Sequence, residues 1–175
     1  MKLIDGIKLQ GRPAEIPGCS RDDLPIFLKQ MGYKVGAEIG VYKGEFSKKF
    51  CHAGLTLYAI DPWLVYSGYN APQGQEMLDT QYKRAKKTLS RYPNSTIIRK
   101  ASMEALKDFA DESLDFVYID GNHNLKYVVE DICEWSKKVR NGGVICGHDY
   151  FFTDPKEPQK VSHIPHAVRA YVDSY

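Results

Sequence analysis

The stretch from Lys34 to Phe50, KVGAEIGVYKGEFSKKF, constrains the fold more than any other part of this 175-residue chain. A short apolar run precedes a turn that carries Gly40 and Gly44, and a helix is predicted to begin at Glu45. Glycines let a backbone approach a ligand closely, and a helix N-terminus offers free N–H donors. The sequence therefore predicts a nucleotide-type cradle. A plain strand–turn–helix connection with two glycines is the alternative.

The spacing of this turn separates it from dinucleotide-binding enzymes. It is E-x-G-x-x-x-G rather than G-x-G-x-x-G, and Tyr42 stands where the middle glycine would be. Close packing against a pyrophosphate is therefore not expected. Glu38 lies inside the first predicted strand, where a buried carboxylate is costly unless it is paired. A cationic or amine-bearing ligand beside Gly40 would pair it.

A second apolar run, from Leu57 to Ile60, ends on an acid, Asp61. In doubly wound folds an acid about 20 residues beyond the glycine turn lies at the end of the second strand and holds ribose hydroxyls. A carboxylate suits a vicinal diol because it accepts two hydrogen bonds. The alternative is that Asp61 caps the turn before Pro62.

Composition excludes several classes of protein. The length and a hydrophobic content of 43% fit one domain with a full core. A net charge of +2 gives no support for a nucleic-acid or membrane-surface partner, and no apolar run approaches the ~20 residues that span a bilayer. The N-terminus lacks the apolar region of a signal peptide. The four cysteines form no C-x-x-C pair and three of them fall in apolar periodic segments, so we expect reduced core cysteines, no zinc site built on them and a cytoplasmic protein.

Strand and helix patterns alternate along the chain. Residues 1–33 are expected to form an irregular lead-in and a covering helix, and residues 34–175 the main domain. Further apolar runs predict strands at 96–100, 114–120 and 144–149, and helical periodicity predicts helices at 75–92 and from about 124 to a stop at 141–143. This order predicts an α/β fold with a doubly wound, Rossmann-like parallel sheet between two helical layers.

Polar groups gather at the ends of the predicted strands, where open parallel sheets bind ligands. In order, the motifs resemble those of class I S-adenosylmethionine-dependent methyltransferases, and most closely the group of macrocin- and catechol-type O-methyltransferases (methyltransferase family 24). The resemblance covers about residues 34–150 and is carried by Glu38-x-Gly40-x-x-x-Gly44, Asp61, Asp120-Gly-Asn-His123 and Gly142-Gly143 with His148-Asp149.

The resemblance implies methyl transfer to a hydroxyl of a small molecule, with S-adenosylmethionine as cofactor. It assigns cofactor contacts to ten residues at the strand ends: Glu38, Gly40, Tyr42, Gly44, Asp61, Pro62, Trp63, Ser102, Met103 and Asp120. Ser102 and Met103 would contact the adenine; plain capping of a short helix by Ser102 is the alternative. Trp63, Tyr66 and Tyr69 would wall the adenine or an aromatic substrate, or else pack on one another in a surface loop.

Asp120, His148 and Asp149 form a candidate site for a divalent metal that lowers the pKa of the acceptor hydroxyl. The matching positions of catechol-type enzymes supply oxygen ligands, which suit magnesium. His148 departs from that pattern, so it either does not touch the metal or favours manganese, iron or zinc. His123 lies where catechol-type enzymes place their general base, and Asp120 would act with it; a structural role in the turn is the alternative.

The chain departs from the family pattern after the fifth strand. The sixth and seventh strands of the class I sheet are not found, so either the chain is truncated or the sheet has five parallel strands with an exposed edge, which would invite pairing with a second copy of the chain. Rival hypotheses are a hydroxylase-associated relative of this family, an NAD-linked oxidoreductase, and a cofactor-binding or assembly module without catalysis.

Overall fold

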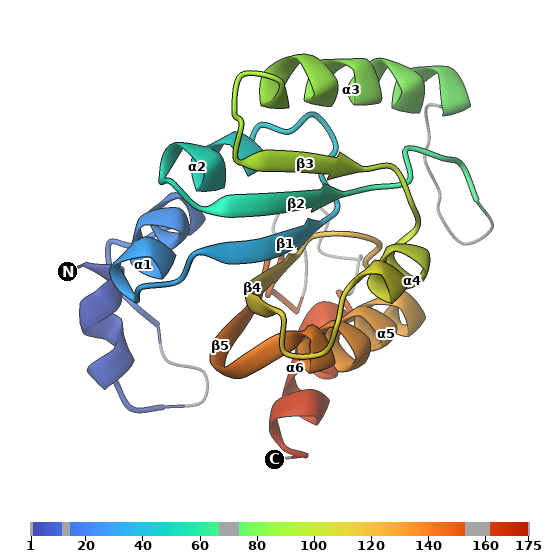
Figure 1. The fold of residues 1–175 in the computed structure, drawn as a ribbon. Coiled ribbons are helices and arrows are strands. Elements are labelled where there is room, and N and C mark those ends of the chain that lie inside the picture. Colours follow the sequence, from blue (N-terminus) through green and yellow to red (C-terminus); the bar gives the residue numbers. More distant parts are fainter. Residues whose placement is uncertain (1, 12–14, 67–73, 153–161, 175) are drawn as a thin grey trace.

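The computed structural model describes residues 2–11, 15–66, 74–152 and 162–174 (Figure 1). Its regular elements alternate between strands and helices. In chain order they are η1 (Leu3–Lys8), η2 (Arg21–Asp23), α1 (Leu24–Gln30), β1 (Val35–Ile39), α2 (Ser47–His52), β2 (Thr56–Ile60), α3 (Gly74–Leu89), β3 (Ser95–Ile98), α4 (Ser102–Ala105), η3 (Leu106–Asp108), β4 (Leu114–Ile119), α5 (Leu125–Trp135), η4 (Ser136–Lys138), β5 (Val139–Gly147) and α6 (Ile164–Val172), where η marks a 3-10 helix.

The strands form one parallel sheet in the order β3-β2-β1-β4-β5. The order reverses beside β1, which pairs with β2 on one side and with β4 on the other. A doubly wound sheet binds ligands at such a reversal, outside the carboxyl ends of the strands. The predicted fold class is confirmed, and the described part of the chain contains five of the strands of a class I sheet.

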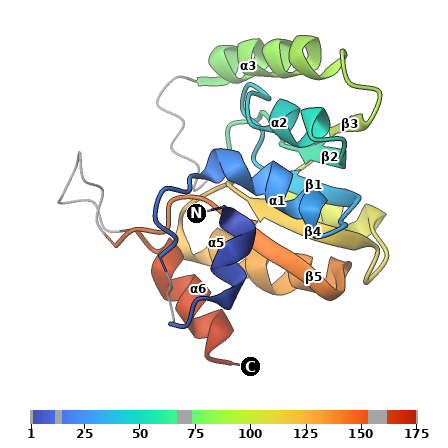
Figure 2. The same cartoon turned by 90° about the vertical axis from the view of Figure 1, so that its left-hand side faces the viewer.

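Helices cover both faces of the sheet because consecutive strand residues point to opposite sides. On β4, Phe116 and Tyr118 enter one core with α1, α2 and α3, whereas Val117 enters a second core beside Trp135 of α5. Figures 1 and 2 show α3 beside the edge strand β3 and α6 at the opposite end, beyond β5. The structure is thus a three-layer α/β/α arrangement.

The fifth strand begins earlier than its apolar run predicts. Helix α5 ends at Trp135, and β5 starts at Val139 rather than Val144. The glycines expected to stop the helix lie inside β5, where the pairing with β4 shifts register between Leu114 and Phe116. Gly142 has a positive φ of 75°, and a Cβ on Gly143 would lie 2.5 Å from the carbonyl oxygen of Asp115. The two glycines therefore permit an irregularity in the strand.

The sequence predicts that the cysteines are reduced and lie in the core, and that the chain has no membrane-spanning segment. All four cysteines are free thiols, but only Cys51 is buried, and Cys133 is exposed on α5. The expectation of a core position is therefore wrong for Cys133. Among the described residues, no helix has the length and apolar character needed to cross a bilayer.

Candidate functional site

A cavity of about 520 Å³ opens at the carboxyl ends of the strands. Its volume lies within the range of roughly 300–1,000 Å³ that is usual for small-molecule sites. Residues at or after four strand ends, with others of helices α3, α4 and α5, line it: Ile39, Gly40, Tyr42, Ile60, Asp61, Pro62, Trp63, Leu64, Tyr66, Leu78, Ala101, Ser102, Met103, Asp120, Gly121, Asn122, Tyr127, Glu130 and Asp131. Most of the cofactor contacts predicted from the sequence thus face one cavity.

The glycine turn shapes one wall of this cavity. Gly40 has a φ of 90°, and a Cβ there would lie 2.1 Å from the carbonyl oxygen of Asp120. Only glycine therefore lets the end of β1 pass so close to the end of β4. Tyr42 also adopts a left-handed backbone, with φ 53°, and its side chain is 48% exposed. Helix α2 begins at Ser47 rather than at Glu45, and Gly44 packs near Ala85 of α3, outside the cavity lining.

Asp61 ties the glycine turn to the end of β2. Its Oδ2 accepts hydrogen bonds from the backbone N–H groups of Val41 and Tyr42, both at 3.0 Å, and its Oδ1 accepts from Trp63 N–H at 2.7 Å. Burial raises the pKa of this carboxyl, and the three N–H donors oppose the rise. A carboxylate offers about four acceptor positions, so one on Oδ1 remains for a ligand in the cavity.

Glu38 points away from this cavity. It is 1% exposed and lies on the face of the sheet that α2 covers, in register with Ala59 of β2 and Tyr118 of β4. The hydroxyl of Ser47 donates to its Oε2. Burial raises the pKa of Glu38 to about 8; the Ser47 hydrogen bond opposes the rise, and Asp120 and Asp61 add to it. Within the protein, the serine hydroxyl is thus a hydrogen-bond partner of this buried acid.

The aromatic loop after Asp61 combines core and cavity roles. Trp63 is 1% exposed, its ring lies 4.9 Å from that of Tyr82, and its Nε1 donates to the carbonyl oxygen of Tyr42 at 2.8 Å. It therefore supports the glycine turn from within the core, while Tyr66 contacts Asn122 Nδ2 at 3.2 Å. Tyr69, the third predicted aromatic, lies outside the described residues.

Ser102 does not cap helix α4. Ala101 occupies the N-cap position, and the Ser102 hydroxyl donates instead to Asp131 Oδ1 of α5. Sequence reasoning missed Asp131, although a helical pattern places it on the same face as Val128, Ile132 and Trp135. An acid on an otherwise apolar helix face is the sequence signal that could have identified Asp131 as a residue of the site.

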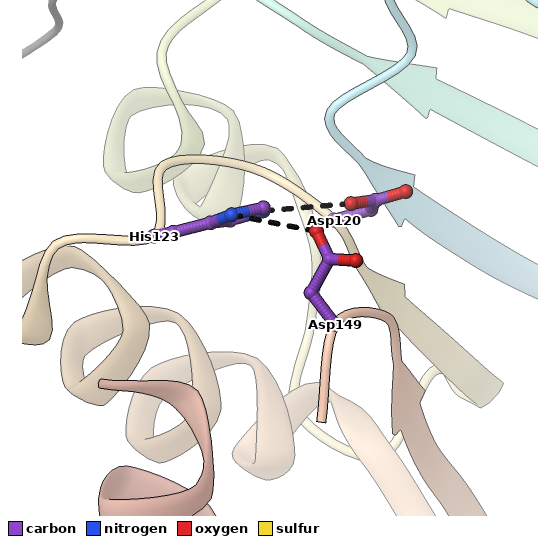
Figure 3. Close-up of side chains that lie close together, drawn as sticks. All are labelled: Asp120, His123 and Asp149. Atoms are coloured by element: carbon purple, nitrogen blue, oxygen red, sulfur yellow. Dashed lines mark ion pairs between the residues drawn. The ribbon is translucent and has the colours of Figure 1, made fainter. Parts of the chain in front are cut away.

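Three side chains from two strand ends meet at the rim of the cavity. His123 Nε2 lies 3.6 Å from Asp120 Oδ1, and His123 Nδ1 lies 3.5 Å from Asp149 Oδ2 (Figure 3). One ligand atom from each of the three residues lies within 4.8 Å of the others, so the group could hold a metal ion. Asp149 has a left-handed backbone with φ 57°, a strain often found at functional sites.

His148, which the sequence places in the metal set, lies beside these three residues. Its Nδ1 is 2.7 Å from Asp149 Oδ1 and 3.9 Å from Asp120 Oδ1. The structure thus groups His123 with the two carboxylates and places His148 against Asp149. Both imidazoles are near enough to influence an ion at the carboxylates.

Arg21 places a positive charge beside the carboxylate of Asp120, and the sequence did not predict this contact. It comes from η2, and its Nη1 lies 3.5 Å from Asp120 Oδ2. Its guanidinium also lies 4.9 Å from the ring centroid of Phe46. The N-terminal segment therefore reaches the strand ends, a contact between distant parts of the chain that no local pattern reveals.

A second cavity, of about 260 Å³, lies between β4, β5, α5 and α6. Its lining is mainly apolar, with two imidazoles: Ile119, Gly121, Asn122, His123, Val128, Ile132, Ile145, Cys146, Gly147, His148, Tyr150, Ile164, Val168, Tyr171 and Val172. The two cavities share Gly121 and Asn122. Asp120 lines only the large cavity and His123 only the second, so their contact crosses the shared wall.

The doubly wound sheet, the glycine turn after β1 and the acids at the strand ends define the class I methyltransferase fold. Residues 37–150 match the profile of a family described as a methyltransferase domain. The match covers more than half of the chain, and the chain belongs to this family. The family and the fold predicted from the sequence are both confirmed.

Solved structures are similar in fold. A protein provisionally assigned as a caffeoyl-CoA O-methyltransferase from Staphylococcus aureus aligns with TM-score 0.57 and 17% identity over 79% of this chain and 61% of that one. A methyltransferase dependent on S-adenosylmethionine (SAM) from Archaeoglobus fulgidus aligns with TM-score 0.56 and 16% identity, over 89% and 68%. The Podospora anserina methyltransferase PaMTH1, solved with S-adenosylhomocysteine, gives TM-score 0.55 and 14% identity, over 75% and 53%.

Among curated proteins, the chain is 29% identical over 121 residues to the uncharacterized protein y4gI of Sinorhizobium fredii. The aligned region covers 64% of this chain but only 12% of that protein. The chain thus spans a small part of this much longer relative.

Proposed function

We propose that this chain transfers the methyl group of S-adenosylmethionine to a hydroxyl group of a small molecule, assisted by a divalent cation such as magnesium or manganese. The observation that carries the proposal is the wall between the two cavities. Asp120 faces the large cavity, His123 faces the second, and their side chains lie 3.6 Å apart. Methyl transfer needs a donor site and an acceptor site that meet at a proton acceptor.

The residues of the large cavity fit the cofactor. S-adenosylmethionine supplies a methyl group made electrophilic by a sulfonium. In our proposal Gly40 and Tyr42 border its amino-acid end, the remaining acceptor position of Asp61 receives the ribose diol, and Ser102 and Met103 flank the adenine. The cavity volume of about 520 Å³ supports a ligand of this size.

The cluster at the rim fits a hard cation and a base. Asp120 and Asp149 provide carboxylate oxygens, which magnesium and manganese prefer, and His148 holds one of these oxygens at 2.7 Å. A cation there would stabilise negative charge on the acceptor oxygen. His123, between the two carboxylates, takes the hydroxyl proton, and Asp120 and Asp149 stabilise the imidazolium that forms.

The second cavity supports a compact acceptor. Aliphatic side chains of α5, β5 and α6, among them Val128, Ile132, Ile145 and Ile164, surround about 260 Å³. An acceptor with a small apolar body would fill this space and present its hydroxyl to His123 at the wall. Favourable burial of that body would hold the oxygen in line for transfer.

Titration calorimetry tests the cofactor assignment. We expect S-adenosylhomocysteine to bind with one site per chain and NAD to give no measurable heat at the same concentrations. Binding of NAD without binding of S-adenosylhomocysteine would overturn the proposal in favour of an oxidoreductase.

Removal of metal tests the role of the cation. Treatment with a chelator should abolish methylation of hydroxyl acceptors, and magnesium or manganese should restore it. Methylation that persists at full rate in excess chelator would show that the reaction needs no cation and that His123 and the carboxylates act without one.

A further inference from the structure

Asp131 is a buried carboxylate for which the proposed mechanism has no task. It is 4% exposed and lies on the apolar face of α5, with Val128, Ile132 and Trp135. A carboxylate in such surroundings is costly unless hydrogen bonds compensate for its lost hydration. Its partners therefore determine what it can do.

A directed chain of hydrogen bonds holds one of its oxygens. Trp135 Nε1 donates to Ser102 Oγ at 2.8 Å, and Ser102 Oγ donates to Asp131 Oδ1. The indole N–H can only donate, so the Ser102 oxygen must accept from it and direct its single proton to Asp131. Oδ1 is therefore fixed as an acceptor within the protein.

The other oxygen, Oδ2, belongs to a side chain that lines the large cavity. Oδ2 accepts no hydrogen bond from the residues that the structure describes, and it lies 3.5 Å from the position that a Cβ on Gly121 would take. Asp131, Gly121 and Ser102 all line that cavity. Burial raises the pKa of Asp131 to about 6, with the Ser102 hydrogen bond opposing the rise, so at pH 8 the group is a charged acceptor.

We propose that Asp131 Oδ2 accepts a hydrogen bond from the exocyclic amine of the adenine, and so selects a 6-aminopurine over other bases in this cavity. The assignment rests on the proposed use of S-adenosylmethionine. Ala101 and Met103 line the same cavity, and such apolar groups suit the faces of a flat ring whose edge carries one amine group. The fixed direction of the Trp135–Ser102–Asp131 chain makes this specificity testable with a changed base.

The wild-type protein provides the first test and needs no variant. S-Inosylhomocysteine differs from S-adenosylhomocysteine at the base, where a carbonyl oxygen replaces the amine and N1 carries a proton. An acceptor facing that oxygen would leave two buried groups unpaired, so we expect the adenine ligand to bind about 10- to 100-fold more tightly at pH 8. Equal affinities would overturn the assignment of Asp131 while leaving the proposed function intact. Failure of both ligands to bind would overturn the proposed function itself.

The Asp131→Asn variant provides the second test. Because Ser102 must still donate to Oδ1, the new amide nitrogen should take the place of Oδ2 and present N–H donors to the cavity. The preference should therefore invert, with S-inosylhomocysteine binding more tightly than S-adenosylhomocysteine. Tight binding of the inosyl ligand would itself show that the variant is folded. An adenine preference within about threefold of the wild-type value would overturn the proposal.

Glu130→Gln is the matched control. Glu130 lines the same cavity from the same helix, but its side chain is 39% exposed and lies 3.9 Å from Lys126 Nζ. Its substitution removes a neighbouring negative charge without changing the Trp135–Ser102–Asp131 chain. We expect the adenine preference to persist. If Glu130→Gln loses the preference and Asp131→Asn keeps it, the base is selected by Glu130, and the assignment of Asp131 is wrong.

Discussion

Three backbone N–H groups donate hydrogen bonds to the carboxylate of Asp61. These hydrogen bonds determine how the loss of this side chain should affect ligand binding. Asp61→Ala removes the tether between the glycine turn and β2 together with the acceptor proposed for the ribose. We expect the affinity for S-adenosylhomocysteine to fall by about 1–3 kcal/mol, the cost of unpaired buried polar groups. Calorimetry measures the change. Asp111→Ala, an exposed carboxylate paired with Lys138, is the control and should bind as the wild type does.

If Asp61→Ala binds with unchanged affinity, Asp61 serves only the turn, and the ribose contact lies elsewhere. The sequence alone could not choose between these two roles. The structure shows that the turn role is real and that one acceptor position remains beyond it.

His123 lies between two carboxylates, so it could act either as a general base or as a metal ligand. Its substitution distinguishes these two roles. His123→Ala should lower kcat by about 10²- to 10⁴-fold, because a general base acts mainly in the transition state. Affinities for S-adenosylhomocysteine and for manganese should stay near the wild-type values. Asp120→Ala should lose both turnover and manganese binding. Single-turnover rates and metal titration together check the pair.

A loss of manganese affinity in His123→Ala, without a loss in His148→Ala, would make His123 the imidazole ligand and would move the base elsewhere. Full turnover in His123→Ala would leave it only a turn residue. The two imidazoles flank Asp149 closely enough that only this comparison separates them.

At the scale of the element, the turn after β1 depends on the absence of a side chain at Gly40. Gly40→Ala would place a Cβ 2.1 Å from the carbonyl oxygen of Asp120, whereas Gly32→Ala meets nothing within 4 Å. Both glycines have a positive φ, 90° and 82°, so both substitutions carry similar backbone strain. We expect Gly40→Ala to destabilise the protein by about 1–3 kcal/mol more than Gly32→Ala. Urea denaturation compares the two variants, and equal losses would show that the ends of β1 and β4 can separate without cost.

The strands were predictable because each buried strand of a parallel sheet is a short apolar run. The run at 35–39 matches β1 to the residue, the apolar run 57–60 begins one residue after β2 does, and the run 114–120 ends one residue after β4 does. The start of β5 was not predictable, because a strand irregularity at Gly142 and Gly143 resembles a helix stop in sequence. A glycine in the sequence indicates that a positive φ is possible, but it does not tell whether the end of a helix or an irregular strand contains it.

Site residues that lie at the end of a strand could be predicted from the sequence. Contacts between elements that are distant in the sequence could not. Asp61 and Asp120 follow from the strand pattern. Arg21 and the pairing of Ser102 with Asp131 depend on how η2 and α5 pack, and no spacing along the chain encodes these contacts. Glu38 was recognised as a buried acid, but its partner Ser47 lies on the helix after the turn.

For the whole molecule, Glu38 couples stability to pH. Burial raises its folded pKa from 4.5 to about 8, so the folded state holds a proton that the unfolded chain releases. The contribution to stability is fully present below pH 4.5 and is lost as the pH rises through about 8. Glu38→Gln removes this dependence. The unfolding free energy of the variant, relative to the wild type, should therefore increase between pH 5 and pH 8.

Urea unfolding at the two pH values checks this prediction, with Asp115→Asn as the control. Amide N–H donors from Val35 and Lys34 and the Arg140 guanidinium outweigh burial and lower the pKa of Asp115. That group is ionised at both pH values, so its loss should cost the same at each. A Glu38→Gln difference that does not change with pH would show that Glu38 is ionised in the folded protein.

The wall of Gly121 and Asn122 has a consequence for the order of events in turnover. If each reactant occupies its own cavity, neither has to leave before the other can enter, and neither completes the other's compartment. Initial-rate plots should then intersect as for a random sequential mechanism, and S-adenosylhomocysteine should inhibit competitively against the methyl donor but not against the acceptor.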